Sequence, residues 1–266
     1  MERLRLGVFK LASCDGCQLS VLACVDALLA VADRLEVVYF PEIMRRPLRG
    51  QLDVALVEGS VCTAAQVEEV RRVRERTRLL VTLGACAHAG GVQALRNLAD
   101  GRAMLRAVYA RPEYVASLAR STPVADHVAV DYELRGCPPS PAQVAQVLAA
   151  CLDGRLPRLR DEPVCAECKR AGAACVLVAH GTPCAGPVTH AGCGALCPRQ
   201  GRGCYACFGP APDAEVPALI ARLEAVGMPR AAAVRLLQTI NAWAPAFRDA
   251  DAGGRAPHTT RAGHGR

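Results

Sequence analysis

Cysteine is the residue type that most constrains how this chain can fold. The 266 residues include 15 cysteines, an odd number, and several of them stand in Cys-x-x-Cys pairs. This spacing suits a shared metal centre, whereas a disulfide framework needs an even count and an oxidising compartment. The basic start of the chain has no apolar stretch behind it, so we expect no secretory signal and a cytoplasmic location. Metal ligation by thiolates is therefore the simplest interpretation of the cysteines.

Composition argues against several other classes of protein. No apolar run reaches the roughly 18–20 residues that cross a bilayer, so we expect no membrane span. The net charge is +7, but no basic stripe carries interleaved aromatic residues, so we expect no nucleic-acid partner. The motifs of phosphate loops, dinucleotide-binding turns and nucleophile elbows are missing. We therefore expect the chain alone to bind neither a nucleotide nor an organic substrate.

Residues 1–156 are predicted to form alternating strands and helices. Short apolar runs predict strands at 4–11, 36–40, 53–57, 79–83 and 128–134. Helical spacing of apolar residues predicts helices at 19–32, 64–76, 92–98, 104–120 and 141–152. Strands that alternate with helices indicate an α/β fold, in which a parallel sheet carries helices on both faces.

The character of the sequence changes after residue 156. Residues 157–212 are rich in Cys, Gly and Pro and lack long periodic segments, so metal crosslinks are expected to supply stability that a hydrophobic core cannot. Residues 213–249 predict C-terminal helices. Residues 250–266 predict a disordered tail.

Four cysteines of the first domain each follow a predicted strand. They are Cys14, Cys17, Cys86 and Cys137. The carboxyl ends of parallel strands meet at one edge of a sheet, so loops far apart in sequence should bring these four thiolates together. Glycines beside the cysteines allow backbone N–H groups to approach the sulfur atoms, and helix N-termini favour an anionic centre.

Eight more cysteines lie in the second region. They are Cys165, Cys168, Cys175, Cys184, Cys193, Cys197, Cys204 and Cys207. Two four-thiolate clusters require eight ligands, and a proline directly follows Cys197, as in ferredoxin runs. The spacing leaves open which of the eight share a cluster. Zinc also binds four thiolates at this spacing, so a zinc-binding interaction protein without a redox role stays an alternative.

The motifs around the first four cysteines resemble those of a known family. Three segments are similar to the small subunit of [NiFe]-hydrogenases and to a related electron-carrying subunit of respiratory complex I: Cys14-Asp15-Gly16-Cys17, Gly84-Ala85-Cys86 with Gly90-Gly91, and Gly136-Cys137-Pro138-Pro139. The resemblance implies a flavodoxin-like domain whose four cysteines ligate a proximal [4Fe–4S] cluster. It also implies that this cluster faces the nickel–iron site of a large subunit, which is a separate chain.

The second cysteine region resembles a smaller set of proteins within this family. The run from Cys184 to Pro210 is similar to the small (delta) subunits of cytosolic group 3 [NiFe]-hydrogenases, which are sulfhydrogenase-like enzymes linked to NAD(P), and to their F420-linked relatives. Ala206 departs from the pattern, which has glycine there. The resemblance implies a ferredoxin-like domain in which the eight cysteines hold two further [4Fe–4S] clusters.

The same resemblance implies a function and its partners. The chain is expected to relay electrons between the large subunit and a flavin- or NAD(P)-linked reductase, with ferredoxin-like subunits as further partners. The complex I subunit lacks the second cysteine region, so a complex I-like or membrane-hydrogenase electron-transfer subunit is the weaker alternative.

Three cysteines and two histidines stand outside these ligand sets. Cys24, Cys62 and Cys151 lie in or beside predicted helices, and we expect them to be small buried residues. His88 lies in a cysteine loop and His190 in the second region. Neither histidine is needed as a ligand, because cysteines already complete the sets.

Glu58 follows the third predicted strand and should therefore lie near the first four cysteines. It is the candidate for proton transfer to or from the partner's active site. The alternative is a strand-end charge that packs against an arginine. We expect no other residue of this chain to be catalytic.

Overall fold

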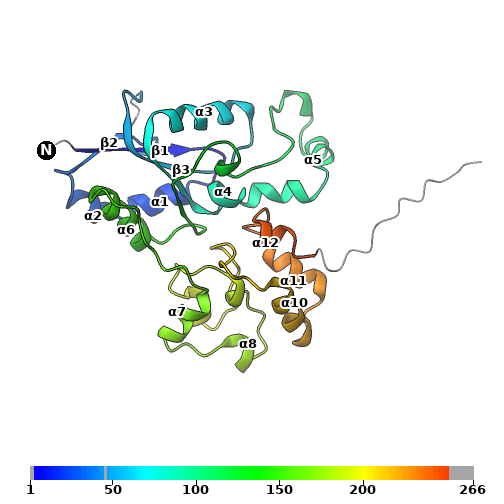
Figure 1. The fold of residues 1–266 in the computed structure, drawn as a ribbon. Helices are drawn as coiled ribbons and strands as arrows, with labels where there is room; N and C mark the ends of the chain where they lie inside the picture. The colour runs from blue at the N-terminus through cyan, green and yellow to red at the C-terminus, as the bar shows by residue number, and fades with distance from the viewer. Residues whose placement is uncertain (1–2, 45–46, 252–266) are drawn as a thin grey trace, which may run out of the picture.

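The computed structural model describes residues 3–44 and 47–251. Its centre is a parallel sheet with the strand order β2-β1-β3-β4-β5 (Figure 1). The strands are β1 (Leu4–Lys10), β2 (Leu35–Tyr39), β3 (Leu52–Glu58), β4 (Thr77–Leu83) and β5 (Tyr132–Leu134). This order is that of flavodoxin-like folds, and it confirms the predicted α/β architecture.

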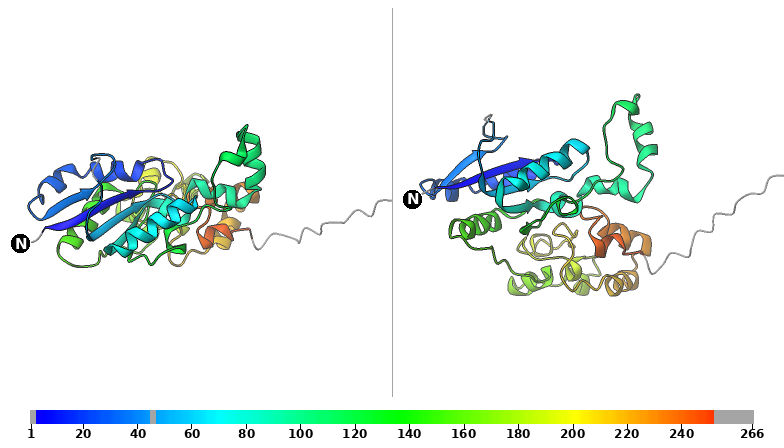
Figure 2. Two further views of the ribbon diagram at one scale, coloured as in Figure 1. Left: turned by 90° about the horizontal axis from the view of Figure 1, so that it is seen from above. Right: turned by 45° about the horizontal axis from the view of Figure 1, so that its top comes forward.

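Both faces of the sheet are buried. Successive residues of β3 point to opposite sides, so that Val54 and Leu56 join one apolar core while Ala55 and Val57 join the other. The first core is closed by α1 (Gly16–Leu22), α2 (Val25–Leu29) and α6 (Pro141–Leu152). The second core is closed by α3 (Ala64–Glu75) and α4 (Gly84–Ala89), so the sheet lies between two helical layers (Figure 2).

Local signals fix where two of these helices begin. Thr63 and Gln66 form a capping box at the start of α3, with the Gln66 N–H donating to Thr63 Oγ1 at 3.2 Å. Ser140 caps α6, and Pro141 occupies the first helical position, where its missing N–H costs nothing. The second cap directly follows the loop that carries Cys137, and it therefore fixes the exit of that loop.

Four predicted elements are wrong in extent or type. The predicted helix at 19–32 begins earlier and is broken into α1 and α2 by a turn. The predicted helix at 104–120 is helical only in α5 (Gly101–Val108) and in the 3₁₀ turn η2 (Pro112–Tyr114). Proline disfavours the helical conformation in the residue before it, and α5 buries no residue that could anchor a longer helix. Residues 92–98 form a 3₁₀ helix, η1 (Val92–Leu98), and the strand predicted at 128–134 is reduced to β5.

The cysteine-rich region contains only short helices, and the C-terminal helices pack on it. The helices of the cysteine-rich region are α7 (Val164–Arg170), α8 (Val176–Ala179), η4 (Gly186–Val188) and α9 (Leu196–Arg199). The C-terminal helices are α10 (Val216–Ala225), α11 (Arg230–Leu237) and α12 (Pro245–Arg248). One apolar core contains Val188 from the cysteine-rich region together with Ile220 and Phe247 from the C-terminal helices. The boundaries at residues 156, 212 and 249 stay predictions, and residues 252–266 of the predicted tail lie outside the described residues. Within the described ranges, no helix is long and apolar enough to cross a membrane.

Candidate metal centres

The four cysteines of the first domain meet at the carboxyl edge of the sheet. Cys14 and Cys17 lie at the junction of β1 and α1, Cys86 lies on α4 directly after β4, and Cys137 follows β5. We call these residues the proximal group. Burial raises the pKa of the Cys86 thiol to about 11, and the nearby thiols of Cys137 and Cys14 contribute to the same shift. The structure thus brings together thiols from three loops that are far apart in the sequence.

Two glycines leave space that the proximal sulfur atoms need. A Cβ atom at Gly84 would lie 2.3 Å from the Cys17 sulfur, and one at Gly91 would lie 2.4 Å from the Cys86 sulfur. Both glycines have positive φ angles, +86° and +63°, which side-chain-bearing residues rarely adopt. A side chain at either position would therefore collide with a sulfur atom of the proximal group.

The thiols of Cys17, Cys86 and Cys137 are poorly suited to ionise on their own. Burial raises the pKa of Cys17, and the neighbouring Glu58, Cys86 and Cys137 raise it further. Burial likewise raises the pKa of Cys137. A bound metal centre deprotonates its thiol ligands, so its positive charge is the partner that this donor set lacks. The residues present fit an iron–sulfur cluster held by four cysteines.

The eight later cysteines lie close together, and we describe them as two groups of four that meet where the Cys204 N–H donates to Cys184 Sγ at 3.2 Å. We count the proximal group as the first. The group farthest from it, which we call the third group, consists of Cys165, Cys168, Cys175 and Cys184. Burial raises the pKa of Cys165 to about 11, with further contributions from the other three thiols of this group. Helix α7 carries Cys165 and Cys168 one turn apart, so both thiols can face the same centre.

The second group consists of Cys193, Cys197, Cys204 and Cys207. All four line one cavity of about 630 Å³, and Cys137 of the proximal group lines it too. Burial raises the pKa of Cys207 to about 12, and the thiols of Cys193, Cys137 and Cys197 add to the shift. Over residues 3–44 and 47–251, no three Cys, His, Asp or Glu side chains gather tightly enough to hold a single metal ion.

Comparison with known proteins identifies the family. Residues 14–151 match the family described as NADH ubiquinone oxidoreductase, 20 Kd subunit. Sulfhydrogenase 2 subunit delta of Pyrococcus furiosus is 38% identical over 240 residues, which cover 90% of this chain and 100% of that protein. The chain belongs to the hydrogenase small-subunit family. A vhu subunit of the F420-non-reducing hydrogenase of Methanocaldococcus jannaschii is 32% identical over 77% of this chain and 82% of that protein.

Solved hydrogenase structures share the fold. A chain of an NAD+-reducing [NiFe]-hydrogenase in the H2-reduced state is 32% identical, with a TM-score of 0.55, over 60% of this chain and 96% of that chain. A chain of the [NiFeSe]-hydrogenase from Dm. baculatum is 18% identical, with a TM-score of 0.54, over 80% of this chain and 97% of that chain. As a hydrogenase small subunit, this chain is part of an oxidoreductase that acts on H2. The family implies iron–sulfur clusters in the small subunit and a nickel–iron site in a large-subunit partner.

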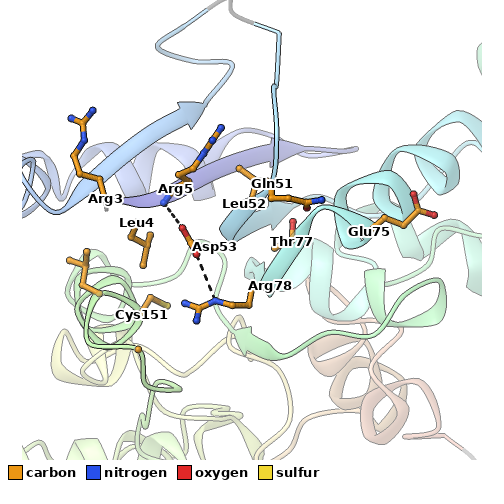
Figure 3. Close-up of a pocket in the computed structure, with 12 residues that line it drawn as sticks. Arg3, Leu4, Arg5, Gln51, Leu52, Asp53, Glu75, Thr77, Arg78 and Cys151 are labelled. Atoms are coloured by element: carbon orange, nitrogen blue, oxygen red, sulfur yellow. Dashed lines mark hydrogen bonds and ion pairs between the residues drawn. The ribbon is translucent and has the colours of Figure 1, made fainter. Parts of the chain in front are cut away.

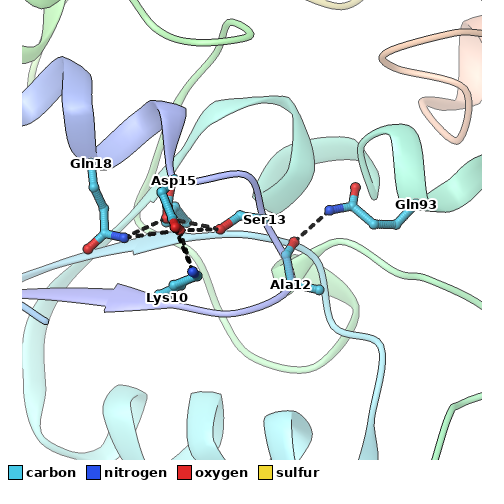
Figure 4. Close-up of polar contacts among 7 residues, drawn as sticks. Lys10, Ala12, Ser13, Asp15, Gln18 and Gln93 are labelled. Carbon is cyan, nitrogen blue, oxygen red and sulfur yellow. Dashed lines mark hydrogen bonds and ion pairs between the residues drawn. The ribbon is translucent and has the colours of Figure 1, made fainter. Parts of the chain in front are cut away.

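Glu58 lies behind the proximal group of this small subunit and is fully buried. Its Oε1 accepts hydrogen bonds from Ser13 Oγ at 3.0 Å and from Gln18 Nε2 at 2.9 Å. Burial raises the pKa of the Glu58 carboxyl, although these two hydrogen bonds lower it. Its partners are thus a hydroxyl and an amide rather than the arginine of the alternative interpretation. Ser13 also contacts Asp15, which pairs with Lys10 at 2.6 Å near the surface (Figure 4).

Two glutamines beside the proximal group were not predicted from the sequence. Gln18 is fully buried and binds Glu58. Gln93 donates from Nε2 to the Ala12 carbonyl at 2.8 Å (Figure 4). Its Oε1 lies 3.5 Å from the Cys86 sulfur. A polar residue directly after Cys17, at a helix start that is otherwise apolar, could have pointed to Gln18. Nothing in the sequence pattern marks Gln93.

Both histidines have a ring nitrogen within 3.0 Å of an oxygen atom. His88 Nδ1 lies 2.9 Å from Glu133 Oε2, on the neighbouring strand β5. His190 Nδ1 lies 2.7 Å from the Ala191 carbonyl oxygen, and its Nε2 lies 3.0 Å from Asp161 Oδ1. These contacts accord with ligand sets that consist of cysteine alone.

The remaining cysteines are buried, as expected. Cys24 donates to the Pro141 carbonyl at 2.9 Å, and Cys62 lies 3.4 Å from the Ser121 hydroxyl. Cys151 lines a cavity of about 690 Å³ at the opposite, amino edge of the sheet (Figure 3). Asp53 accepts a hydrogen bond from the backbone N–H of Arg5 at 2.9 Å, and its carboxylate lies 3.8 Å from the Arg78 guanidinium.

Proposed function

We propose that this chain is the electron-transfer small subunit of a cytoplasmic [NiFe]-hydrogenase. In this proposal it holds three [4Fe–4S] clusters and connects the nickel–iron site of the large subunit with a flavin- or NAD(P)-linked reductase. The observation that carries the proposal is the arrangement of twelve cysteines in three adjoining groups of four. The clusters supply one-electron transfer when they are bound.

The order of the groups supports a linear relay. Cys137 of the proximal group and Cys207 of the second group are close enough for each thiol to line the same cavity. Cys193 of the second group in turn lies near Cys168 of the third group. Burial raises the pKa of the Cys168 thiol, and Cys193 is among the nearby thiols that raise it further. The second group therefore stands between the other two. We propose that each group of four binds one cluster, with the division given above.

Both ends of this row reach the surface, because Cys14 and Cys137 of the proximal group are exposed. The proximal group lies at the sheet edge, and we propose that this edge faces the large subunit. Cys175 of the third group is exposed. We propose that electrons are exchanged with the reductase, or with ferredoxin-like subunits, at this far end. The chain's own residues set the spacing, burial and hydrogen bonding of each site.

The NAD(P)-linked form of the proposal is supported by one relative of known structure. The NAD+-reducing [NiFe]-hydrogenase contains a chain that is 32% identical to this one. The complex I-like alternative is less well supported, because the 20 Kd family match ends at residue 151 and leaves all eight later cysteines unexplained. Sulfhydrogenase 2 subunit delta matches along its full length.

Metal analysis tests the proposed function. The full-length chain, purified without oxygen, should be brown and contain about twelve iron atoms and about twelve acid-labile sulfides, which is the content of three four-iron clusters. Electron paramagnetic resonance of the reduced protein should show the corresponding paramagnetic clusters. A colourless protein that contains zinc and no iron would refute the proposal and favour the zinc-binding interaction protein.

Glu58 stays the candidate for proton transfer near the proximal group. Its contacts with Ser13 and, through Ser13, with Asp15 lead from a buried carboxyl toward Lys10 at the surface. Glu58→Gln should slow H2 turnover several-fold without loss of iron. Ser13→Ala should have the same effect if this route carries protons. Wild-type turnover in both variants would leave Glu58 a purely structural residue.

A further inference from the structure

A single carboxylate joins the second and third cysteine groups. Glu167 lies on α7, inside the Cys-x-x-Cys pair of the third group, and its side chain reaches the loop of the second group. Its Oε1 accepts a hydrogen bond from the Gly192 N–H at 3.0 Å, and its Oε2 accepts one from the Ala195 N–H at 3.1 Å. The same Oε2 lies 3.9 Å from the Cys193 sulfur. Both oxygens of one side chain thus bind the backbone on either side of a cysteine in the neighbouring group.

The loop that Glu167 binds has a backbone shape that needs support. Ala195 has a φ of 54°, in the left-handed region, which costs a residue with a side chain roughly 1 kcal/mol or more. Ala195 is also fully buried, so its N–H must find an acceptor within the protein. Charge-assisted hydrogen bonds are about twice as strong as neutral ones. The carboxylate therefore holds in place a loop that local conformational preference alone would not hold.

The carboxylate of Glu167 lies close to ligands of both groups. Its Oε2 lies 3.9 Å from the Cys193 sulfur of the second group. Glu167 also directly precedes Cys168 of the third group on α7, and a carboxylate at such short range repels added negative charge. A reduced centre carries one more negative charge than an oxidised one, so the same repulsion disfavours reduction at either group.

We propose that Glu167 is a positioning residue that fixes the Cys193 loop against the third group and lowers the reduction potentials of the centres at both groups. This inference rests on the proposed function, since it requires clusters at these cysteines. It goes further because it assigns two effects to one side chain: the position of the two cysteine groups relative to each other, and the reduction potentials of the centres that they hold.

The test compares two variants of the full-length chain, purified without oxygen. Glu167→Gln keeps the length of the side chain and one acceptor oxygen but removes the charge. Glu167→Asp keeps the charge and shortens the reach. The matched control is Glu162→Gln, because Glu162 lies in the same region and pairs with Arg170 at the surface. Iron and sulfide are counted first, and the midpoint potentials are then measured by titration monitored by electron paramagnetic resonance.

The expected results are specific to each variant. Glu167→Gln should shift the midpoint potentials of two of the three centres to more positive values and leave the third unchanged. Glu167→Asp should shift them less, and Glu162→Gln should leave all of them unchanged. Unchanged potentials in an iron-loaded Glu167→Gln variant would overturn the inference.

Iron content decides the case in which Glu167→Gln is too unstable to titrate. Loss of iron in Glu167→Gln, with full iron in Glu162→Gln, supports the positioning role, whereas equal loss in both variants overturns it. A wild-type chain that lacks iron and sulfide refutes the proposed function itself. The two failures are therefore distinguishable.

Discussion

The proximal group and the two later groups hold their thiols by different physical means. The proximal cysteines come from loops spread between residues 14 and 137, and each loop leaves a strand of a sheet that has apolar cores on both faces. The other eight lie between residues 165 and 207, where α7, α8 and α9 have only 7, 4 and 4 residues. Helices this short are not stable alone. The proximal group is positioned by the fold, whereas the proposed function makes the second region dependent on metal crosslinks and on the helices that follow it.

Removal of iron should expose this difference most strongly. In the chain treated with a chelator under anaerobic conditions, backbone amides of α7 and α9 should lose nearly all protection from hydrogen exchange, because metal binding supplies the folding free energy of such a region. Amides of β1, β3 and β4 should keep theirs. Hydrogen exchange measured by mass spectrometry checks both. Equal loss of protection in the sheet would contradict the proposal that only the cysteine-rich region depends on metal for its stability.

Replacement of one ligand at each end of the row should separate the roles of the groups. Cys86→Ala should abolish H2-linked dye reduction by the complete hydrogenase and remove about four iron atoms, because the proximal centre is the entry point. Cys175→Ala should also remove about four iron atoms but keep most dye reduction, while reduction of the physiological acceptor is lost. Iron analysis and the two activity assays give the readout. Dye reduction retained in Cys86→Ala would contradict the role assigned to the proximal group.

A single added methyl group should damage the proximal site. Gly84→Ala places a Cβ atom 2.3 Å from the Cys17 sulfur at a φ of +86°. Backbone strain of this kind costs roughly 1–3 kcal/mol, and the displaced sulfur should lose its iron. Gly101→Ala, in α5, is the matched control, because its Cβ meets no atom within 4 Å. Chemical unfolding and iron content are measured in both. Equal destabilisation would show that the space beside Cys17 is not required.

The sheet and the proximal group could be predicted because both follow from local pattern and topology. The predicted strand at 53–57 corresponds to β3, and the predicted helix at 141–152 corresponds to α6. Once the strands are parallel, the ends of β1, β4 and β5 must meet, and Cys14, Cys86 and Cys137 meet with them. Position in the chain was therefore enough to place these cysteines.

The rest of the site depends on tertiary contacts that have no periodic signal. Gln93 lies in a segment predicted as an ordinary helix, yet its amide binds the Ala12 carbonyl from 81 positions away. Glu167 reads as one more charge on a short helix, and its role is visible only when the Cys193 loop lies beside it. The sequence left the pairing of the eight later cysteines open for the same reason, since few regular elements fix the path of the chain between them.

The smallest effect is expected from the core shared by the cysteine-rich region and the C-terminal helices. Ile220 of α10 is fully buried there, and α10 packs on η4 beside Cys184. Ile220→Val removes one methylene group and should cost about 0.5–1.5 kcal/mol. Since 1 kcal/mol is roughly a fivefold change in an opening equilibrium, chelators should extract iron from this region about fivefold faster. Val54→Ala, in the sheet core, should instead speed only the release of proximal iron. If Ile220→Val leaves iron release unchanged, the C-terminal helices do not support the cysteine groups, and the crosslinks alone hold that half of the molecule together.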